Sequence, residues 1–310
     1  MRFAYSQHHL SIETQISTWV EKSHAGGLQV FALLDGSMFR QREIQQLARA
    51  SLHFRPALLG SPFESLESQG PLLWEINGSN PKILAMLLRR TDGIPALSLI
   101  ATTKPPEDLR EVLLWLAIAH TQDEQRLHCR FADTRTLPPL LYSLNSDQLD
   151  RLGKAMNAWL WITRDGKIET RQFTIRATPS VQESDTFQLD ASQFDFMLTT
   201  AEADMVFQML DEKMSDLIPD SPPHEVHARI ASLLNTARGY GITDLPDLFQ
   251  YTVVALSTRD DFDRHPAVRD TWTRLKSEAL SFSALAKQWP ETFWLAFTPP
   301  DEDAVAFDPE

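Results

Sequence analysis

The stretch LQVFALLDGS, residues 28–37, carries the clearest structural signal in the chain. Residues 28–34 are almost entirely apolar, and Asp35-Gly36 follows them at once. A short apolar run closed by a turn dipeptide is typical of a buried strand. Residues 11–22 precede this run and place apolar side chains at helical spacing, at Ile12, Ile16, Trp19 and Val20. The start of the chain therefore predicts a helix followed by a buried strand.

Strand-like and helix-like segments continue to alternate up to about residue 173. Further strands are predicted at residues 72–76, 96–101, 126–131, 159–163 and 168–173. Helices are predicted from Pro81 to Arg90, from Pro105 to Ala117 and over residues 137–144, because prolines open the first two and leucines recur along all three. Asp165-Gly166 separates the last two strands, and this dipeptide favours a tight hairpin.

The second half of the chain has a different pattern. Residues 176–192 lose periodicity and are predicted to form a linker. Five helical segments are predicted after it, over residues 202–218, 224–240, 245–258, 266–280 and 282–297. We therefore expect a mixed α/β (α+β) domain over residues 1–178, an all-α helical domain over residues 179–298, and an acidic, disordered tail over residues 299–310.

Charge is distributed unevenly between these halves. Residues 1–178 contain 20 Lys+Arg and 18 Asp+Glu, a balance of +2, whereas residues 179–310 contain 9 and 24, a balance of −15; together they give the net charge of −13. An acidic surface repels phosphate backbones, so the sequence predicts no nucleic-acid partner. It also shows neither a secretion signal nor an apolar run long enough to span a membrane. The single cysteine, Cys129, cannot form an internal disulfide, and a cytoplasmic location is expected.

Known catalytic motifs are missing from the sequence. It contains no G-x-S-x-G turn and no glycine-rich phosphate loop. Asp35 lacks the second aspartate that phosphohydrolase chemistry needs two residues later, where Ser37 stands. His224 and His227 could share one face of a helix, but no third metal ligand follows nearby, so surface positions are favoured. Cys129 is expected to be a buried thiol on a strand. We therefore predict no catalytic residue, no metal site and no cofactor.

One group of residues remains open to two interpretations. Charged side chains gather where predicted strands and helices meet, together with one aromatic residue: Asp35, Arg110, Arg130, Phe131, Asp133 and Arg135. Such charges often form ion pairs that fix neighbouring loops, because an unpaired and partly buried charge is costly. The same side chains could instead contact a partner protein.

Five short motifs also occur in a recognisable order: FALLDGS at 31–37, LLGS at 58–61, PLL at 71–73, Leu109-Arg110, and CRFADTR at 129–135. In this order they resemble the Tap/TEC adaptor family, chaperones that load toxic effectors onto the spike of the bacterial type VI secretion system. The resemblance is best over residues 28–165 and looser in the helical half. Ala132 and Thr134 depart from the family, whose members often have an aromatic residue and a proline there.

The resemblance implies a non-catalytic, cytosolic adaptor. Such a protein would bind a cognate effector, through the effector's N-terminal segment, and bring it to the valine-glycine-repeat (VgrG) spike protein. The acidic half is expected to steer this association. Two alternatives stay open at this point: an immunity-type protein that neutralises a toxin, and an enzyme that uses the Asp35/Arg130/Asp133/Arg135 cluster.

Overall fold

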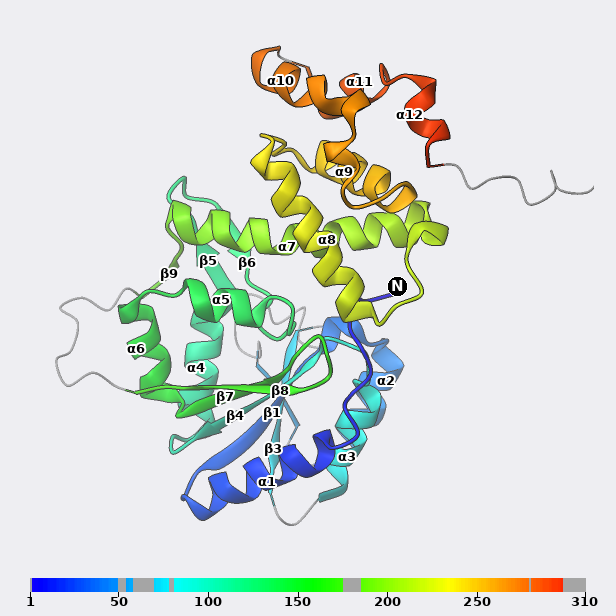
Figure 1. Cartoon of the computed structure of the whole chain (residues 1–310). Helices are drawn as coiled ribbons and strands as arrows, with labels where there is room; N and C mark the ends of the chain where they lie inside the picture. Colours follow the sequence, from blue (N-terminus) through cyan, green and yellow to red (C-terminus); the bar gives the residue numbers. More distant parts are fainter. Residues whose placement is uncertain are drawn as a thin grey trace, which may run out of the picture. The chain divides into compact units, whose positions relative to one another are not determined.

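The computed structural model describes residues 2–49, 54–57, 70–77, 81–174, 185–278 and 280–297. The residues of the chain group into two compact units, each with most of its contacts inside itself (Figure 1). Tyr5–Ala201 forms the first, which we call the α/β unit; Met1–Ala4 and Glu202–Glu310 form the second, the helical unit. The predicted domain boundary at residue 178 and the predicted tail, residues 299–310, lie outside the described residues.

A six-stranded antiparallel sheet forms the centre of the α/β unit, with the strand order β2-β3-β1-β4-β7-β8. Its strands are β1 (Gln29–Asp35), β2 (Phe54–Pro56), β3 (Pro71–Ile76), β4 (Leu97–Thr102), β7 (Ala158–Ile162) and β8 (Ile168–Gln172). Strand β1 lies between β3 and β4, with Val30 opposite Ile76 on one side and opposite Ala101 on the other. Every β1 residue after Gln29 is buried, which explains why the sequence of this strand is apolar without alternation.

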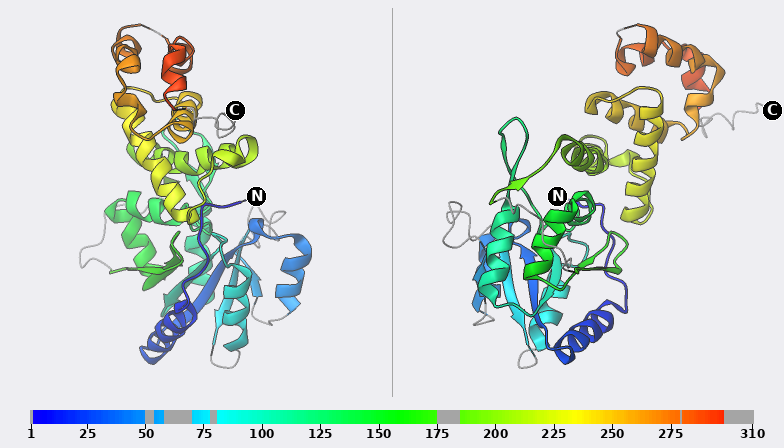
Figure 2. Two further views of the ribbon diagram at one scale, coloured as in Figure 1. Left: turned by 45° about the vertical axis from the view of Figure 1, so that its right-hand side comes forward. Right: turned by 90° about the vertical axis from the view of Figure 1, so that its left-hand side faces the viewer.

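Helices cover both faces of this sheet (Figure 2). One face packs against α1 (Ile12–Ala25), α2 (Gln41–Arg49) and α3 (Pro81–Arg90). The other packs against α4 (Pro106–Ala117), α5 (Leu137–Ser143) and α6 (Ser146–Ala155). Successive side chains of a strand point to opposite faces. Val30, Ala32 and Leu34 accordingly lie in the first core, and Phe31 and Leu33 in the second.

A small second sheet completes the α/β unit. Its order is β6-β5-β9, from β5 (Ile118–His120), β6 (Arg126–His128) and β9 (Phe187–Gln188). Leu189 donates its backbone N–H to the His120 carbonyl over 2.8 Å, and the Gln188 carbonyl accepts a hydrogen bond from the Gln148 side-chain amide over 2.6 Å. The later part of the predicted linker is therefore attached to the α/β unit by strand pairing and hydrogen bonds.

The helical unit contains α-helices joined by short 3₁₀ turns. Its helices are the second part of α7 (Ala191–Lys213), α8 (Pro223–Gly239), α9 (Leu245–Ser257), α10 (Arg269–Ser277), α11 (Phe282–Ala286) and α12 (Glu291–Leu295). The division between the units falls within α7, between Ala201 and Glu202. Aromatic side chains fill much of the core, and four of them, Tyr251, Phe262, Phe282 and Phe293, are completely buried.

The predicted fold class is confirmed: a mixed region with an antiparallel sheet precedes a helical region. The predicted strand at 126–131 is too long, since β6 ends at His128 and the chain then turns. The single helix predicted over 282–297 is wrong; Pro290, which has no N–H to continue a helix, separates α11 from α12. Across the described ranges, every helix falls short of the length or apolar character needed to cross a bilayer.

Candidate functional site

The loop that follows β6 docks where β1 ends and β4 begins. Asp35 donates its backbone N–H to the Ala96 carbonyl over 2.9 Å, and Thr134 donates to the Pro95 carbonyl over 3.0 Å. Because β1 and β4 are antiparallel, the end of one strand lies beside the start of the other. The sheet therefore places Asp35 next to residues that come almost a hundred positions later in the sequence.

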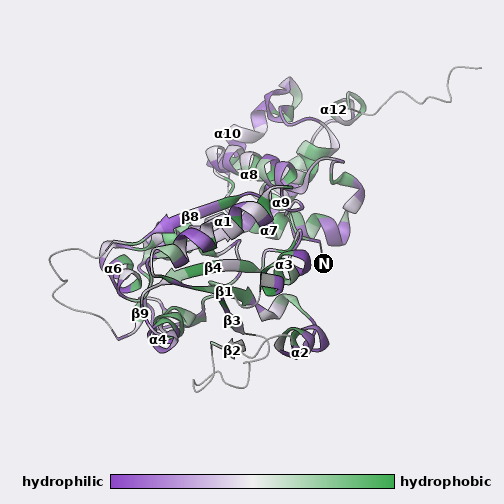
Figure 3. Ribbon diagram, turned by 90° about the horizontal axis from the view of Figure 1, so that it is seen from below, coloured by the Kyte–Doolittle hydropathy of each residue, from purple (hydrophilic) through white to green (hydrophobic). Residues whose placement is uncertain are grey.

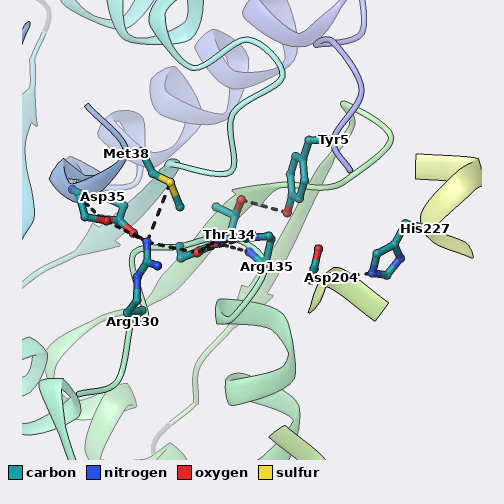
Figure 4. Close-up of polar contacts among 10 residues, drawn as sticks. Tyr5, Asp35, Met38, Arg130, Thr134, Arg135, Asp204 and His227 are labelled. Carbon is teal, nitrogen blue, oxygen red and sulfur yellow. Dashed lines mark hydrogen bonds and ion pairs between the residues drawn. The ribbon is translucent and has the colours of Figure 1, made fainter. Parts of the chain in front are cut away.

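Arg130 joins this loop to the end of β1 (Figure 4). Its Nη2 lies 2.8 Å from Asp35 Oδ2 and 2.9 Å from Ser37 Oγ. The same nitrogen is 3.5 Å from Asp133 Oδ2. One guanidinium group therefore contacts two carboxylates from different segments of the α/β unit.

Arg135 holds the second carboxylate from the other side. Its Nε donates to Asp133 Oδ1 over 3.0 Å and its Nη2 donates to Asp133 Oδ2 over 2.7 Å, while its backbone N–H reaches Oδ1 over 2.9 Å. This two-pronged arrangement is the strongest geometry for an arginine–carboxylate pair. It accounts for a carboxylate side chain that is only 2% exposed.

Phe131 anchors the loop in the apolar core. Its side chain is fully buried and meets the Trp159 ring edge-on, with the ring centroids 6.3 Å apart. The Trp159 indole N–H donates to Ser98 Oγ over 3.0 Å, so this aromatic pair is itself fixed to β4. Loop 129–136 is thus held both by the apolar packing of Phe131 and by the ion pairs of Arg130 and Arg135 on either side of it.

The charges of this network balance. Two carboxylates, from Asp35 and Asp133, face two guanidinium groups, from Arg130 and Arg135. Both carboxylates are nearly inaccessible, whereas the Arg130 side chain is 40% exposed. A buried carboxylate that loses its partner carries a large desolvation cost, so the arginines stabilise this arrangement of the loop.

Cys129 stands beside the network but is chemically quiet. It follows β6 rather than lying on the strand as predicted, and it is buried. Burial raises the pKa of the Cys129 thiol to about 12. The nucleophilic form of cysteine is the thiolate, so this thiol stays protonated and unreactive at neutral pH.

The remaining predicted positions are Arg110 and the histidines of the helical half. Arg110 is half-buried on α4, and its predicted part in the network stays a prediction. In the helical unit, His227 Nε2 lies 3.9 Å from Asp204 Oδ2 of α7, a contact that the sequence pattern did not indicate. Within the residues that the structure describes, no group of three His, Cys, Asp or Glu side chains is arranged to hold a metal ion.

Two further residues support the site without having been predicted. Ser37 donates both its backbone N–H, over 3.0 Å, and its hydroxyl, over 2.7 Å, to Asp35 Oδ1. An aspartate followed two residues later by serine is a local turn pattern that could have indicated this pair. The Thr134 hydroxyl donates to the Tyr5 hydroxyl over 3.1 Å. The Arg164 guanidinium lies over the Tyr5 ring, 5.2 Å from the ring centroid. Nothing in the sequence signals a contact over such a separation.

Comparison with known proteins gives one family. Residues 30–151 match the family described as "Domain of unknown function (DUF4123)", the family of the Tap/TEC adaptors of type VI secretion effectors. No curated protein and no solved structure matches the chain. The matched segment starts in β1, ends in α6 and includes all six predicted site residues. The chain therefore contains a DUF4123 domain over residues 30–151, and DUF4123 is the family of the Tap/TEC type VI secretion effector adaptors.

Proposed function

We propose that this protein is a non-catalytic, cytoplasmic adaptor that binds a cognate type VI secretion effector and brings it to the VgrG spike protein. The observation that carries the proposal is the DUF4123 match over residues 30–151. The domain of an adaptor family suggests a role other than catalysis. The adaptor would act as a chaperone, keeping the effector bound until it is transferred to the spike.

The ion-pair network has a structural role in this proposal. Each of its buried carboxylates already faces an arginine at hydrogen-bond distance, and Phe131 is part of the core. These contacts support a network that fixes loop 129–136. Arg130 is the member with the most exposed side chain, so it is also the member best able to touch a partner.

The acidic half has a different role. Residues 179–310 carry a balance of −15, which would attract a partner with a basic surface and raise the association rate. We expect the association rate constant with the effector to fall steeply as ionic strength rises, because salt screens such long-range attraction. An association rate that does not change with salt would contradict this part of the proposal.

Co-purification tests the proposal directly. The full chain is tagged and co-expressed with the effector encoded beside its gene, with and without the VgrG protein. We expect the effector to be retained, and VgrG to be recovered in a complex that contains both. Absence of the effector from the purified material would contradict the adaptor function.

An assay of effector activity separates an adaptor from an immunity protein. The effector's enzymatic activity is measured alone and after saturation with the purified chain. An adaptor leaves that activity intact, whereas an immunity-type protein abolishes it. Loss of effector activity at a one-to-one ratio would therefore replace the present proposal with toxin neutralisation.

A further inference from the structure

Strand β8 forms one outer edge of the six-stranded sheet. It pairs with β7 on one side only, as the second strand of the Asp165-Gly166 hairpin. Unlike β1 and β4, which are hydrophobic, β8 is largely hydrophilic (Figure 3). Its residues are half-buried or exposed, whereas those of β1 beyond Gln29 are buried.

The hydrogen-bond register shows which backbone groups of β8 point outward. Thr163 donates to the Lys167 carbonyl at one end of the hairpin, and Phe173 donates to the Asn157 carbonyl at the other. Hydrogen-bonded pairs alternate along antiparallel strands, so the backbone N–H and C=O groups of Glu169 and Arg171 also point toward β7. The N–H and C=O groups of the intervening residues, Ile168, Thr170 and Gln172, therefore point away from the sheet.

These outward groups have no hydrogen-bond partner in the part of the chain that the structure describes. They repeat every second residue, about 7 Å apart. A row of alternating donors and acceptors at this spacing matches the backbone of another extended chain. The molecule already uses such pairing nearby: Ser6 and His9 of the N-terminal segment donate their backbone N–H groups to the carbonyls of Arg164 and Gly166, in the turn before β8.

A large aromatic side chain stands beside this edge. Tyr142, on α5, is 61% exposed, and its hydroxyl donates to Glu169 Oε1 over 2.5 Å. On the same face of β8, Arg171 donates to the Leu141 carbonyl over 2.8 Å. The Tyr142 ring is thus held over the β8 side of the sheet with much of its surface open to solvent. An extended segment paired with β8 would direct every second side chain toward this face, where the ring offers an apolar contact.

We propose that the outer edge of β8, together with Tyr142, is the docking site for an extended segment of the partner protein, which adds to the sheet as a further strand. The segment pairs through its backbone with residues 168–172 and places an apolar side chain against Tyr142. This inference rests on the proposed function, because it takes the bound effector as the source of the segment.

A second copy of this chain is a weaker occupant of the same edge. Strand β8 has five residues and is about 17 Å long. A contact of that length between two copies covers far less than the roughly 1,200 Å² that stable interfaces bury. A partner's extended segment does not need this strand alone to hold two folded proteins together, because the effector can make its other contacts elsewhere.

Substitution of Thr170 tests the pairing. Thr170→Pro removes an outward N–H without removing a bond to β7, and proline is tolerated on edge strands at such positions. Thr170→Val is the matched control, since it changes the side chain and keeps the N–H. We expect Thr170→Pro to weaken effector binding at least tenfold, and Thr170→Val to leave it within about twofold. Both variants should melt within a few degrees of the wild type.

Tyr142 provides a second, independent test. We expect Tyr142→Ala to weaken binding of the co-expressed effector about five- to tenfold, whereas Tyr142→Phe keeps the ring and retains most of the affinity. Hydrogen exchange gives a readout that does not depend on variants. The amides of Ile168, Thr170 and Gln172 should exchange at least tenfold more slowly in the complex than in the free chain.

The outcomes separate this inference from the proposed function. If the wild-type chain does not retain the effector, both fail. If the wild type and Thr170→Pro bind the effector equally, the edge inference is overturned and the adaptor function stands. A free wild-type chain that is dimeric, with a monomeric Thr170→Pro variant, would assign the edge to a second copy and overturn the inference.

Discussion

The α/β unit and the helical unit are stabilised by contacts of different range. In the α/β unit, the Arg130–Asp35 pair joins residues 95 positions apart, and the Tyr5–Thr134 contact spans 129. In the helical unit, Trp272 donates to the Asp263 carbonyl 9 positions away, and Asp247 binds Ser283 at a separation of 36. An antiparallel sheet brings residues that are distant in the sequence together where its strands begin and end, whereas successive helices pack mainly on their neighbours.

This difference explains where the chain can be recognised. The match to DUF4123 lies inside the α/β unit and stops before the helical unit begins. A strand-end network needs particular charged residues at fixed places in a long sequence, so the order of short motifs identifies it. A helical core needs only apolar side chains at helical spacing, which many sequences can supply.

The largest effects are expected from removal of a buried aromatic ring in each unit. Phe262 is fully buried in the helical unit, with the Tyr251 ring centroid 4.9 Å away. Phe131 is its counterpart in the α/β unit. Each substitution to alanine should lower the free energy of unfolding by about 3–5 kcal/mol. Differential scanning calorimetry should resolve two transitions, with Phe262→Ala lowering one and Phe131→Ala the other.

If both variants lower the same transition by the same amount, the two units unfold together, and the comparison between them holds for contacts but not for stability. Leu10→Ala serves as the control, because this side chain is fully exposed and should change neither transition.

Asp247 is expected to have the next largest effect. Its buried carboxylate accepts hydrogen bonds at the start of α11 from the Phe282 N–H over 2.5 Å and from the Ser283 N–H over 3.0 Å. Asp247→Ala leaves these donors buried and unpaired, so we expect a loss of about 2–4 kcal/mol. Urea unfolding monitored by tryptophan fluorescence would measure it. Asp247→Asn, which keeps an acceptor oxygen, should lose less than half as much; an equal loss would show that charge, not hydrogen bonding, stabilises this junction.

A comparison of Gly166 with Gly27 separates the effect of a long-range contact from that of the local backbone conformation. Both Gly166 and Gly27 have left-handed backbones, with φ of 74° and 77°. A Cβ on Gly166 would lie 2.2 Å from the Gln7 carbonyl oxygen, whereas nothing lies within 4 Å at Gly27. Gly27→Ala should therefore cost about 1 kcal/mol from backbone strain alone, and Gly166→Ala about 2–3 kcal/mol. Equal losses in urea unfolding would mean that the N-terminal segment moves aside without cost.

Much of the α/β unit could be predicted from local signals. The apolar run before Asp35 and the Asp165-Gly166 turn correspond to β1 and the β7–β8 hairpin. Helix α6 carries a capping box formed by Asn145 and Gln148, a local signal that would have indicated its start. Helix α2 was not predicted, because it has few apolar side chains; two of them, Ile44 and Leu47, lie three positions apart and pack in the first core.

The sequence indicated which residues belong to the candidate site, but not which of them contact one another. Charges at strand ends indicated that Asp35, Arg130 and Asp133 could form ion pairs. Which carboxylate meets which arginine depends on sheet order, and β1 pairs with β3 and β4, neither of which follows it directly in the chain. The contact between Tyr5 and Thr134 depends on that order as well, so no local pattern could predict it.

Arg130 should show a smaller effect than Asp247 because its side chain is 40% exposed, so water can replace part of its contacts. Arg130→Ala is expected to lower the free energy of unfolding by about 1–2 kcal/mol, since Asp35 keeps its bonds from Ser37. A double-mutant cycle with Asp35→Asn would give the coupling between the two residues by urea unfolding. Coupling near zero would show that the pair contributes nothing to stability and would leave Arg130 as a partner-binding residue only.

The smallest effect expected is a pH dependence from His8 in the α/β unit. Its side chain is 10% exposed, and burial lowers the pKa of His8, although the nearby Asp92 carboxylate acts in the opposite direction. Below about pH 6.5, where an unfolded histidine becomes protonated, the unfolded chain binds more protons than the folded chain at this position, so stability falls as pH falls. One histidine limits this slope to about 1.4 kcal/mol per pH unit. Urea unfolding at pH 7.5 and 5.5 should show a smaller acid-induced loss in His8→Gln than in the wild type, while the exposed His9→Gln control keeps the wild-type loss; equal losses in all three proteins would exclude His8 as a source of acid sensitivity.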